Sequence, residues 1–318
     1  MCDLTNPIFN DDDKAREHLE AIRWPNGPVC AQCGALERIV KVQGKSARPG
    51  LYYCNHCAGQ FTVTVGTVFE RSKVPLSKWV LAFHLMCSSK KGISSHQLHR
   101  MLDVTYKTAW FMSHRIREAM RTEPSGPLGG AGKIVEADET YYGNKKGAEW
   151  KWGGTGHKHS IVALVEHKGG VRSFHVPDVT AKNLKPVLLS QIDSKTHLMT
   201  DEATRYWKLG KQFAKHSSVN HSEKEYARGN TSTNTIEGFF SLLKRGLISC
   251  YFHISGDHLQ RYCDEFDFRY SNREKRVKIA GKWQKTGLND AERTVAALKG
   301  IEGKRLTYRR VTGFKPQA

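Results

Sequence analysis

The chain has 318 residues, 39% of them hydrophobic, which is enough to bury a core in two or three domains. Its net charge of +19 at pH 7 predicts a polyanionic partner, with nucleic acid as the first candidate. No apolar run of about eighteen residues predicts a membrane span, and the acidic N-terminus lacks the layout of a secretory signal. We therefore expect a cytoplasmic protein without a membrane partner.

The first structured region is expected within residues 1–68, where a short helix over 11–22 precedes two Cys-x-x-Cys motifs. The motifs are formed by Cys30, Cys33, Cys54 and Cys57. The remaining cysteines are scattered, which disfavours a disulfide framework. Two such motifs on hairpin turns supply four thiolates that close around zinc and leave no open position for catalysis. We predict a structural zinc ribbon; a redox pair, the alternative, would normally occur once.

The pattern becomes helical over residues 69–123. Helices are expected over about 77–86, 94–102 and 105–120, with a tight turn before the third. The last two resemble a helix-turn-helix whose final helix enters the major groove of DNA. Cations on that helix would then face phosphates or bases: Lys107, His114, Arg115, Arg117 and Arg121. A three-helix bundle with a solvated basic face is the alternative.

A Gly- and Pro-rich linker over 124–132 leads to the region 133–271, in which strands and a helix alternate. Strands are expected over 134–140, 159–166, 171–176 and 196–200, and a helix over 181–192. The first and last of these strands end on acids, Asp138 and Asp201. We predict a mixed α/β sheet whose strand tips share a site. The basic, Gly-rich loop 144–158 is interpreted as a hairpin that could contact DNA.

A third carboxylate, Glu237, lies near the start of an amphipathic helix. A capping box of Asn234 with Glu237 would explain this glutamate equally well, and Asp138 alone could begin a turn. As a set, Asp138, Asp201 and Glu237 need cations to ionise together. Two Mg²⁺ ions, or Mn²⁺, about 3.5–4 Å apart would neutralise them and suit phosphodiester chemistry. Glu139 is the less favoured ligand, because neighbouring strand residues point to opposite faces.

The last region, 272–318, is interpreted as a basic C-terminal tail. It contains 13 basic and 4 acidic residues and so carries nearly half of the net charge. A solvated, partly disordered tail and a tail that grips the DNA backbone by counterion release both remain open.

The order and spacing of these motifs resemble those of DDE transposases of bacterial insertion sequences, in the group related to the eukaryotic Merlin elements. The matching residues run from Arg23-Trp24-Pro25 and the paired cysteines through Trp79, Asp138-Glu139-Thr140, Asp201-Glu202, Glu237 and Lys244 to Tyr262, Arg269 and Arg273. The resemblance implies an RNase H-like catalytic domain preceded by a part that recognises terminal inverted repeats. Its metal ligands would be Asp138, Asp201 and Glu237.

The same resemblance implies that Lys244 contacts DNA near the site, with Arg245 beside it. The group varies at its third acidic position, so Asn234, His216 or His221 could approach the metals in place of Glu237. The expected function is Mg²⁺-dependent DNA cleavage and strand transfer on double-stranded DNA, in a synaptic homo-oligomer. Two alternatives remain: a DNA-binding protein derived from a transposase that has lost catalysis, and an RNase H-like nuclease.

Overall fold

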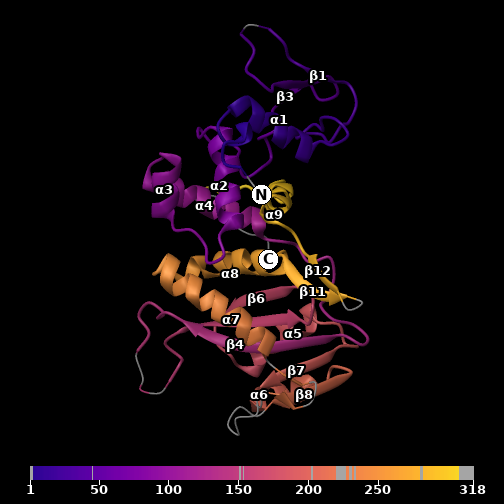
Figure 1. Cartoon of the computed structure of the whole chain (residues 1–318), viewed down its shortest axis with the longest axis vertical. Coiled ribbons are helices and arrows are strands. Elements are labelled where there is room, and N and C mark those ends of the chain that lie inside the picture. The colour runs from indigo at the N-terminus through magenta and orange to yellow at the C-terminus, as the bar shows by residue number, and fades with distance from the viewer. Residues whose placement is uncertain are drawn as a thin grey trace. The chain divides into compact units, whose positions relative to one another are not determined.

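The computed structural model describes residues 3–44, 46–149, 152, 154–201, 203–219, 227–228, 231–232, 234–279 and 282–307. The chain divides into two compact units (Figure 1). The first unit comprises Met1–Ser89, Ile93–Arg121 and Leu288–Ala318, and the second comprises Lys90–Gly92 and Thr122–Gly287. None of the helices in the described ranges is long and apolar enough to cross a membrane.

The first unit begins with the short 3-10 helix η1 (Pro7–Phe9) and helix α1 (Asp12–Arg23). The Asp11 side chain caps α1 by accepting from two backbone amides of its first turn. A three-stranded antiparallel sheet follows, in the order β1 (Ile39–Lys41), β2 (Tyr52–Cys54), β3 (Gly59–Phe61). This small sheet and its four cysteines are the predicted zinc ribbon.

Three helices then occupy the expected positions: α2 (Leu76–Ser88), α3 (Ser95–Leu102) and α4 (Tyr106–Met120). Ser94 and Gln97 form a capping box that begins α3, and the Thr105 side chain caps α4. Between the two helices Asp103 has φ of 47°, a left-handed conformation that turns the chain sharply. Local capping chemistry thus sets the starts of α3 and α4.

The C-terminal region has more structure than the expected tail. Strands β11 (Lys275–Ile279) and β12 (Lys282–Thr286) pair as an antiparallel hairpin within the second unit. Helix α9 (Asp290–Lys299) then belongs to the first unit, where Thr294 Oγ1 lies 3.2 Å from Nδ1 of the buried His84. Beyond it, the backbone amide of Val68 donates to the Ile301 carbonyl. Both ends of the chain therefore build the first unit; residues 308–318 lie outside the described residues.

The second unit contains a five-stranded mixed sheet in the order β6-β5-β4-β7-β8. Its strands are β4 (Ile134–Tyr142), β5 (His159–Glu166), β6 (Val171–Val176), β7 (His197–Asp201) and β8 (Lys215–Val219). Strands β4, β5 and β6 are antiparallel neighbours, whereas β7 runs parallel to both β4 and β8. This is the mixed α/β sheet expected from the sequence.

Helices cover both faces of that sheet. They are α5 (Ala181–Gln191), α6 (Thr204–Gly210), α7 (Asn234–Gly246), the π-helical turn η3 (Leu247–Tyr251) and α8 (Gly256–Ser271). Alternate residues of β5 enter two separate cores: Ile161 packs with α7 and α8, and Val162 packs with α5 and α6. Two-residue strands β9 (Ala227–Arg228) and β10 (Thr231–Ser232) form a small pair just before α7. Residues at the tip of β4 therefore face either α7 or α6.

Candidate functional site

Four thiols converge in the ribbon, and we call them the thiolate cluster: Cys30, Cys33, Cys54 and Cys57. Their sulfur atoms all lie within 4.8 Å of one another. The Cys30–Cys57 and Cys33–Cys54 sulfur distances are 3.6 and 3.8 Å. A tetrahedral zinc ion with Zn–S bonds of about 2.3 Å needs sulfur separations of about 3.8 Å, so the donor set fits zinc. His56, between two of the ligands, is exposed and outside the cluster.

The second cluster forms where β4 and β7 lie side by side. The parallel register pairs Glu136 with Met199, and two residues further along it brings Asp138 beside Asp201. Asp138, Asp201 and Glu139 each offer a carboxylate oxygen within 4.8 Å of the other two. We call these three residues the carboxylate cluster. Two predicted residues that lie far apart in sequence are thus brought together by one strand pairing.

Glu139, expected to be the less favoured ligand because it points to the opposite face of the strand, also belongs to this cluster. Strand alternation does direct it to the α6 face of β4, where the Tyr206 hydroxyl donates to its Oε2 at 2.7 Å and Arg205 pairs with its Oε1. Its carboxylate nevertheless remains within reach of Asp138 and Asp201. A glutamate carboxylate is separated from the backbone by two methylene groups, so its position follows its partners as well as the direction of its Cα–Cβ bond.

The negative charge of the cluster contributes to a raised pKa of Tyr206. This side chain is fully buried, and burial raises its pKa strongly; the carboxylates of Asp138 and Asp201 raise it further. The hydroxyl therefore stays protonated at neutral pH and can donate to Glu139. Arg205 supplies the positive charge nearby, with its Nη2 4.0 Å from Asp201 Oδ2.

Glu136 links this cluster to helix α7. Its side chain is completely buried, its Oε1 pairs with His167 Nε2, and its Oε2 accepts from the backbone amide of Ile236 at 2.7 Å. A buried carboxylate needs partners of this kind to offset its loss of hydration. Glu136 and Asp138 are two residues apart on β4 and so share its α7 face. The hydrogen bond from the Ile236 amide to Glu136 therefore holds the first turn of α7 next to Asp138.

Glu237 directly follows Ile236, whose amide bonds to Glu136. It is exposed in the first turn of α7 and is not among the residues of the carboxylate cluster. Of the alternatives to Glu237, Asn234 is exposed at the start of α7, and His216 Nε2 lies 2.9 Å from Thr200 Oγ1 on the neighbouring strand. His216 is not part of the cluster. His221 lies outside the described residues.

Two regions of the chain match known protein families. Residues 127–271 match the ISXO2-like transposase domain, and residues 10–60 match the transposase zinc-ribbon domain. The chain contains a DDE transposase domain. A protein of Halobacterium salinarum described as an "Uncharacterized protein in transposable element ISH50" is 29% identical over 280 residues, which covers 82% of this chain and 91% of that protein.

The RNase H-like sheet of the transposase domain therefore carries two of its three expected acids side by side, with Glu139 as an unexpected neighbour. Carboxylate oxygens suit Mg²⁺ or Mn²⁺, so the donor chemistry fits the divalent metal that a DDE site implies. Both oxygens of Glu139 are already engaged by Arg205 and Tyr206. Asp138 and Asp201 each accept a hydrogen bond from a backbone amide through Oδ1, from Glu139 and Ala203 respectively. Glu139 differs from them in that side chains hold both of its oxygens.

A cavity of about 360 Å³ lies beyond the tip of β4 in the transposase domain. Its lining includes Lys244 from α7 and Lys158, together with Tyr141 and Asn144 from the end of β4 and the turn after it. Arg245 is exposed, and its guanidinium bonds to Ser241 one turn earlier. The two basic residues predicted on α7 are therefore accessible to a large anionic partner.

The cations predicted on α4 divide into two groups. Lys107 is exposed in the first turn, as a residue that contacts DNA must be. Arg115 and Arg117 are instead buried, at 6% and 1% exposure. Arg117 Nη1 donates to Ser113 Oγ inside the unit, and Arg115 donates to the Glu70 and Leu306 carbonyls. The expectation that these two arginines lie on an open DNA-binding face is corrected by their burial, because α4 is packed on most sides.

Proposed function

We propose that this chain cleaves DNA and transfers strands at the terminal inverted repeats of an insertion sequence, with Mg²⁺ or Mn²⁺ as cofactor. The observation that carries the proposal is the meeting of Asp138 and Asp201 on adjacent parallel strands of a transposase domain. Phosphodiester exchange needs closely spaced carboxylates to hold metal ions at the reacting phosphate. A thiolate cluster could not do this, because four sulfur ligands close the coordination sphere.

Asp138, Asp201 and Glu237 are proposed as the metal-binding residues. Two bound ions would supply activation of the attacking water or 3′-hydroxyl and stabilise the leaving oxygen. Glu136 supports this assignment, because it holds the amide next to Glu237 against the strand that carries Asp138. Lys244 is exposed on α7 and lines the cavity beside β4. We propose that it binds a DNA phosphate close to the site.

Recognition of the DNA ends is assigned to the ribbon and to helices α3 and α4, whose exposed first turn carries Lys107. The net charge of +19 supports a DNA partner. We further propose that two or more copies join in a synaptic complex on DNA in the cytoplasm. Placement in the Merlin-related bacterial group belongs to the same proposal.

The deciding experiment uses DNA that carries the ends of the element, with Mg²⁺, and measures cleavage and joining separately. Asp138→Ala and Asp201→Ala should each reduce both by at least about a thousandfold, the scale of a lost metal ligand or reacting group. Asp178→Ala is the matched control, because Asp178 is an exposed aspartate of the same unit outside the carboxylate cluster. It should retain normal activity.

The three functions give different results in this assay. Cleavage followed by joining supports a transposase, whereas hydrolysis without joining identifies a nuclease. If wild type binds the ends but neither cleaves nor joins them, and Asp138→Ala binds equally well, the chain is a DNA-binding protein derived from a transposase. Glu237→Ala should match Asp138→Ala; activity close to wild type would remove Glu237 from the metal site.

A further inference from the structure

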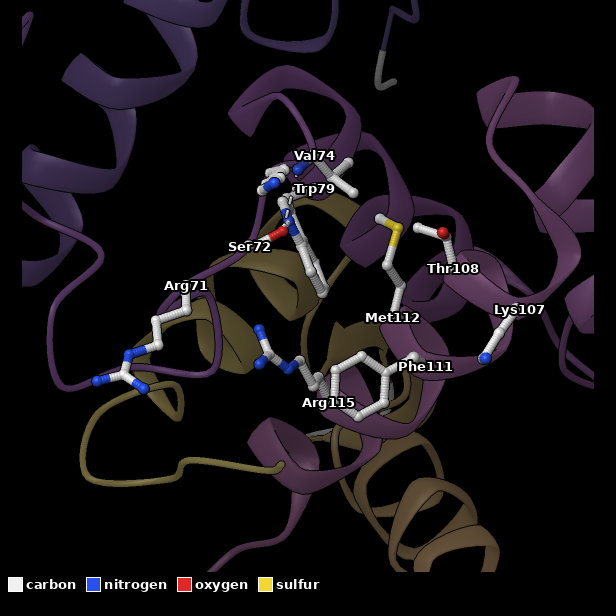
Figure 2. A pocket seen from close by; sticks show the side chains of 10 residues that line it. Arg71, Ser72, Val74, Trp79, Lys107, Thr108, Phe111, Met112 and Arg115 are labelled. Atoms are coloured by element: carbon white, nitrogen blue, oxygen red, sulfur yellow. Dashed lines mark hydrogen bonds between the residues drawn. The ribbon is translucent and has the colours of Figure 1, made fainter. Parts of the chain in front are cut away.

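A cavity of about 320 Å³ opens in the first unit between α4 and the segment before α2, at the lower end of the range for small-ligand sites. Figure 2 shows Phe111, Met112 and Arg115 of α4 around it, with Trp79 facing them. Its lining is Arg71, Ser72, Lys73, Val74, Trp79, Lys107, Thr108, Phe111, Met112 and Arg115. Four of these residues are cations and none is acidic.

Arg115 is the unusual member of this set. Its side chain is 6% exposed, yet its described hydrogen bonds go to the neutral carbonyls of Glu70 and Leu306. The Glu70 carboxylate pairs instead with Arg71 and Arg305, at 3.9 and 3.6 Å. Within the described residues, no carboxylate oxygen lies within 4 Å of the Arg115 guanidinium. A buried cation without an ion-pair partner is costly, so a bound anion would stabilise it.

The rest of the cavity is not built for a bare anion. Trp79 and Met112 are each 1% exposed and form an apolar floor, and Phe111 stacks under Arg115 with the guanidinium carbon 4.6 Å from the ring centre. Ser72 Oγ accepts from Trp79 Nε1 at 3.0 Å and fixes the indole ring (Figure 2). Aromatic faces next to cations are the usual binding surface for a nucleobase attached to its phosphate.

We propose that this cavity binds one nucleotide of a DNA strand, unstacked from its neighbours. The phosphate would meet Arg115 with Lys73 and Lys107 at the rim, and the base would lie against Phe111 and Trp79. Lys107 favours DNA over a free nucleotide as the ligand, because it lines the cavity and also lies in the exposed first turn of α4. A strand contacting that turn passes the mouth of the cavity.

Binding is tested on the full zinc-loaded chain by calorimetry with three probes: thymidine 5′-monophosphate, thymidine and inorganic phosphate. The nucleotide should bind more tightly than phosphate by roughly 5- to 150-fold, the contribution of one base–aromatic stack. It should also bind more tightly than thymidine, because Arg115 needs the anion. If phosphate binds as tightly as the nucleotide, or if no probe binds, the proposal fails.

Two variants separate the cavity from general basic charge. Val74→Phe fills the cavity from its half-exposed edge and leaves every cation and Phe111 in place, so it should abolish the preference for the nucleotide. Lys299→Ala removes an exposed cation of the same unit that does not line the cavity, and should bind as wild type. Nucleotide binding unaffected by Val74→Phe would overturn the proposal.

Unstacking is measured by the fluorescence of 2-aminopurine placed at successive positions of a DNA duplex that carries the element ends. One position should brighten when the protein binds, and Val74→Phe should remove this increase while the salt dependence of binding stays the same. If no position brightens with wild type, DNA does not use the cavity. Because neither measurement reads cleavage, failure here leaves the proposed transposition chemistry untouched, and loss of cleavage in Asp138→Ala leaves the cavity untouched.

Discussion

The thiolate cluster and the carboxylate cluster are built in opposite ways. The thiolates come from two short segments, one before β1 and one at the turn from β2 to β3, and their sulfur atoms contact one another and nearby backbone amides. The carboxylates come from β4 and β7, which are separated along the chain by two strands and a helix, and they are surrounded by Arg205, Tyr206 and the fastened α7. The first cluster offers only ligands that a zinc ion would join, whereas side chains and a backbone amide of other elements hold the second.

The largest expected effect follows from removing a zinc ligand. Cys30→Ser should lose zinc, unfold the ribbon and strongly weaken binding to DNA ends, because binding of a structural zinc ion contributes about 10 kcal/mol or more to folding. The second unit should keep its unfolding transition. Zinc content, DNA affinity and calorimetry measure the three effects.

Cys250→Ser is the control for this change, since Cys250 is a half-buried cysteine outside the thiolate cluster. It should keep a full zinc complement. Unchanged zinc content in Cys30→Ser, or loss of the second unit's transition, would contradict the separation of the two clusters.

The next effect concerns Glu136, the residue that prepares the carboxylate site. Glu136→Ala should slow cleavage by roughly 10- to 100-fold and raise the Mg²⁺ concentration needed, as for other residues that orient metal ligands. Hydrogen exchange of the Ile236 amide should accelerate as well, because its acceptor is gone. This readout does not depend on activity.

Glu136→Gln should restore much of the exchange protection, because its amide oxygen can still accept from Ile236. Glu166→Ala is a matched control: this glutamate of β5 also accepts from a backbone amide, that of Gly129, but does so away from α7. If Glu166→Ala slows cleavage as much as Glu136→Ala, the effect is general destabilisation of the sheet.

A smaller effect is expected at Glu139, whose oxygens are held by Arg205 and Tyr206. Glu139→Gln should slow cleavage by about tenfold and leave the required Mg²⁺ concentration nearly unchanged, as expected for a weakened charge-assisted hydrogen bond. Asp201→Ala provides the comparison in the same Mg²⁺ titration. A loss in Glu139→Gln equal to that in Asp201→Ala would make Glu139 a metal ligand.

The two clusters also differ in how far the sequence reveals them. The spacing of the cysteines predicts the ribbon because both motifs lie on local turns, and Ser94 and Thr105 set the starts of α3 and α4 through local capping. Asp138 and Asp201 could be proposed as strand-end acids, but their contact depends on the pairing of β4 with β7. The role of Glu136 was not predicted, because its partners His167 and Ile236 come from distant elements.

The C-terminal region shows a different reason for a missed prediction. Its high charge favoured a tail, yet Asn289 and Glu292 form a capping box at the start of α9, and Leu298 on that helix is completely buried. That capping sequence was a readable indication of a helix. Which unit the helix would join could not be read locally, because His84 and Val68 belong to the opposite end of the chain.

The smallest expected effect is on the pH dependence of the stability of the second unit. Burial, together with Asp138 and Asp201, raises the pKa of Tyr206 above its ordinary value near 10. The folded state therefore holds the phenolic proton more tightly than the unfolded state. The stability from this proton is complete below about pH 10 and is lost as the pH rises toward the folded pKa. Tyr206→Phe should reduce the alkaline loss of stability of the second unit, and at pH 7 it should cost about 1 kcal/mol for the lost bond to Glu139.

Denaturant unfolding at pH 7, 9 and 10.5 measures both effects of Tyr206→Phe. Tyr53→Phe, which changes a half-buried tyrosine of the ribbon, controls for the loss of any one phenol. A matching change in alkaline slope in both variants would show that Tyr206 does not sense the carboxylates. A reduced slope in Tyr206→Phe alone would show that the folded second unit resists ionisation of this phenol, as its burial beside the two carboxylates predicts.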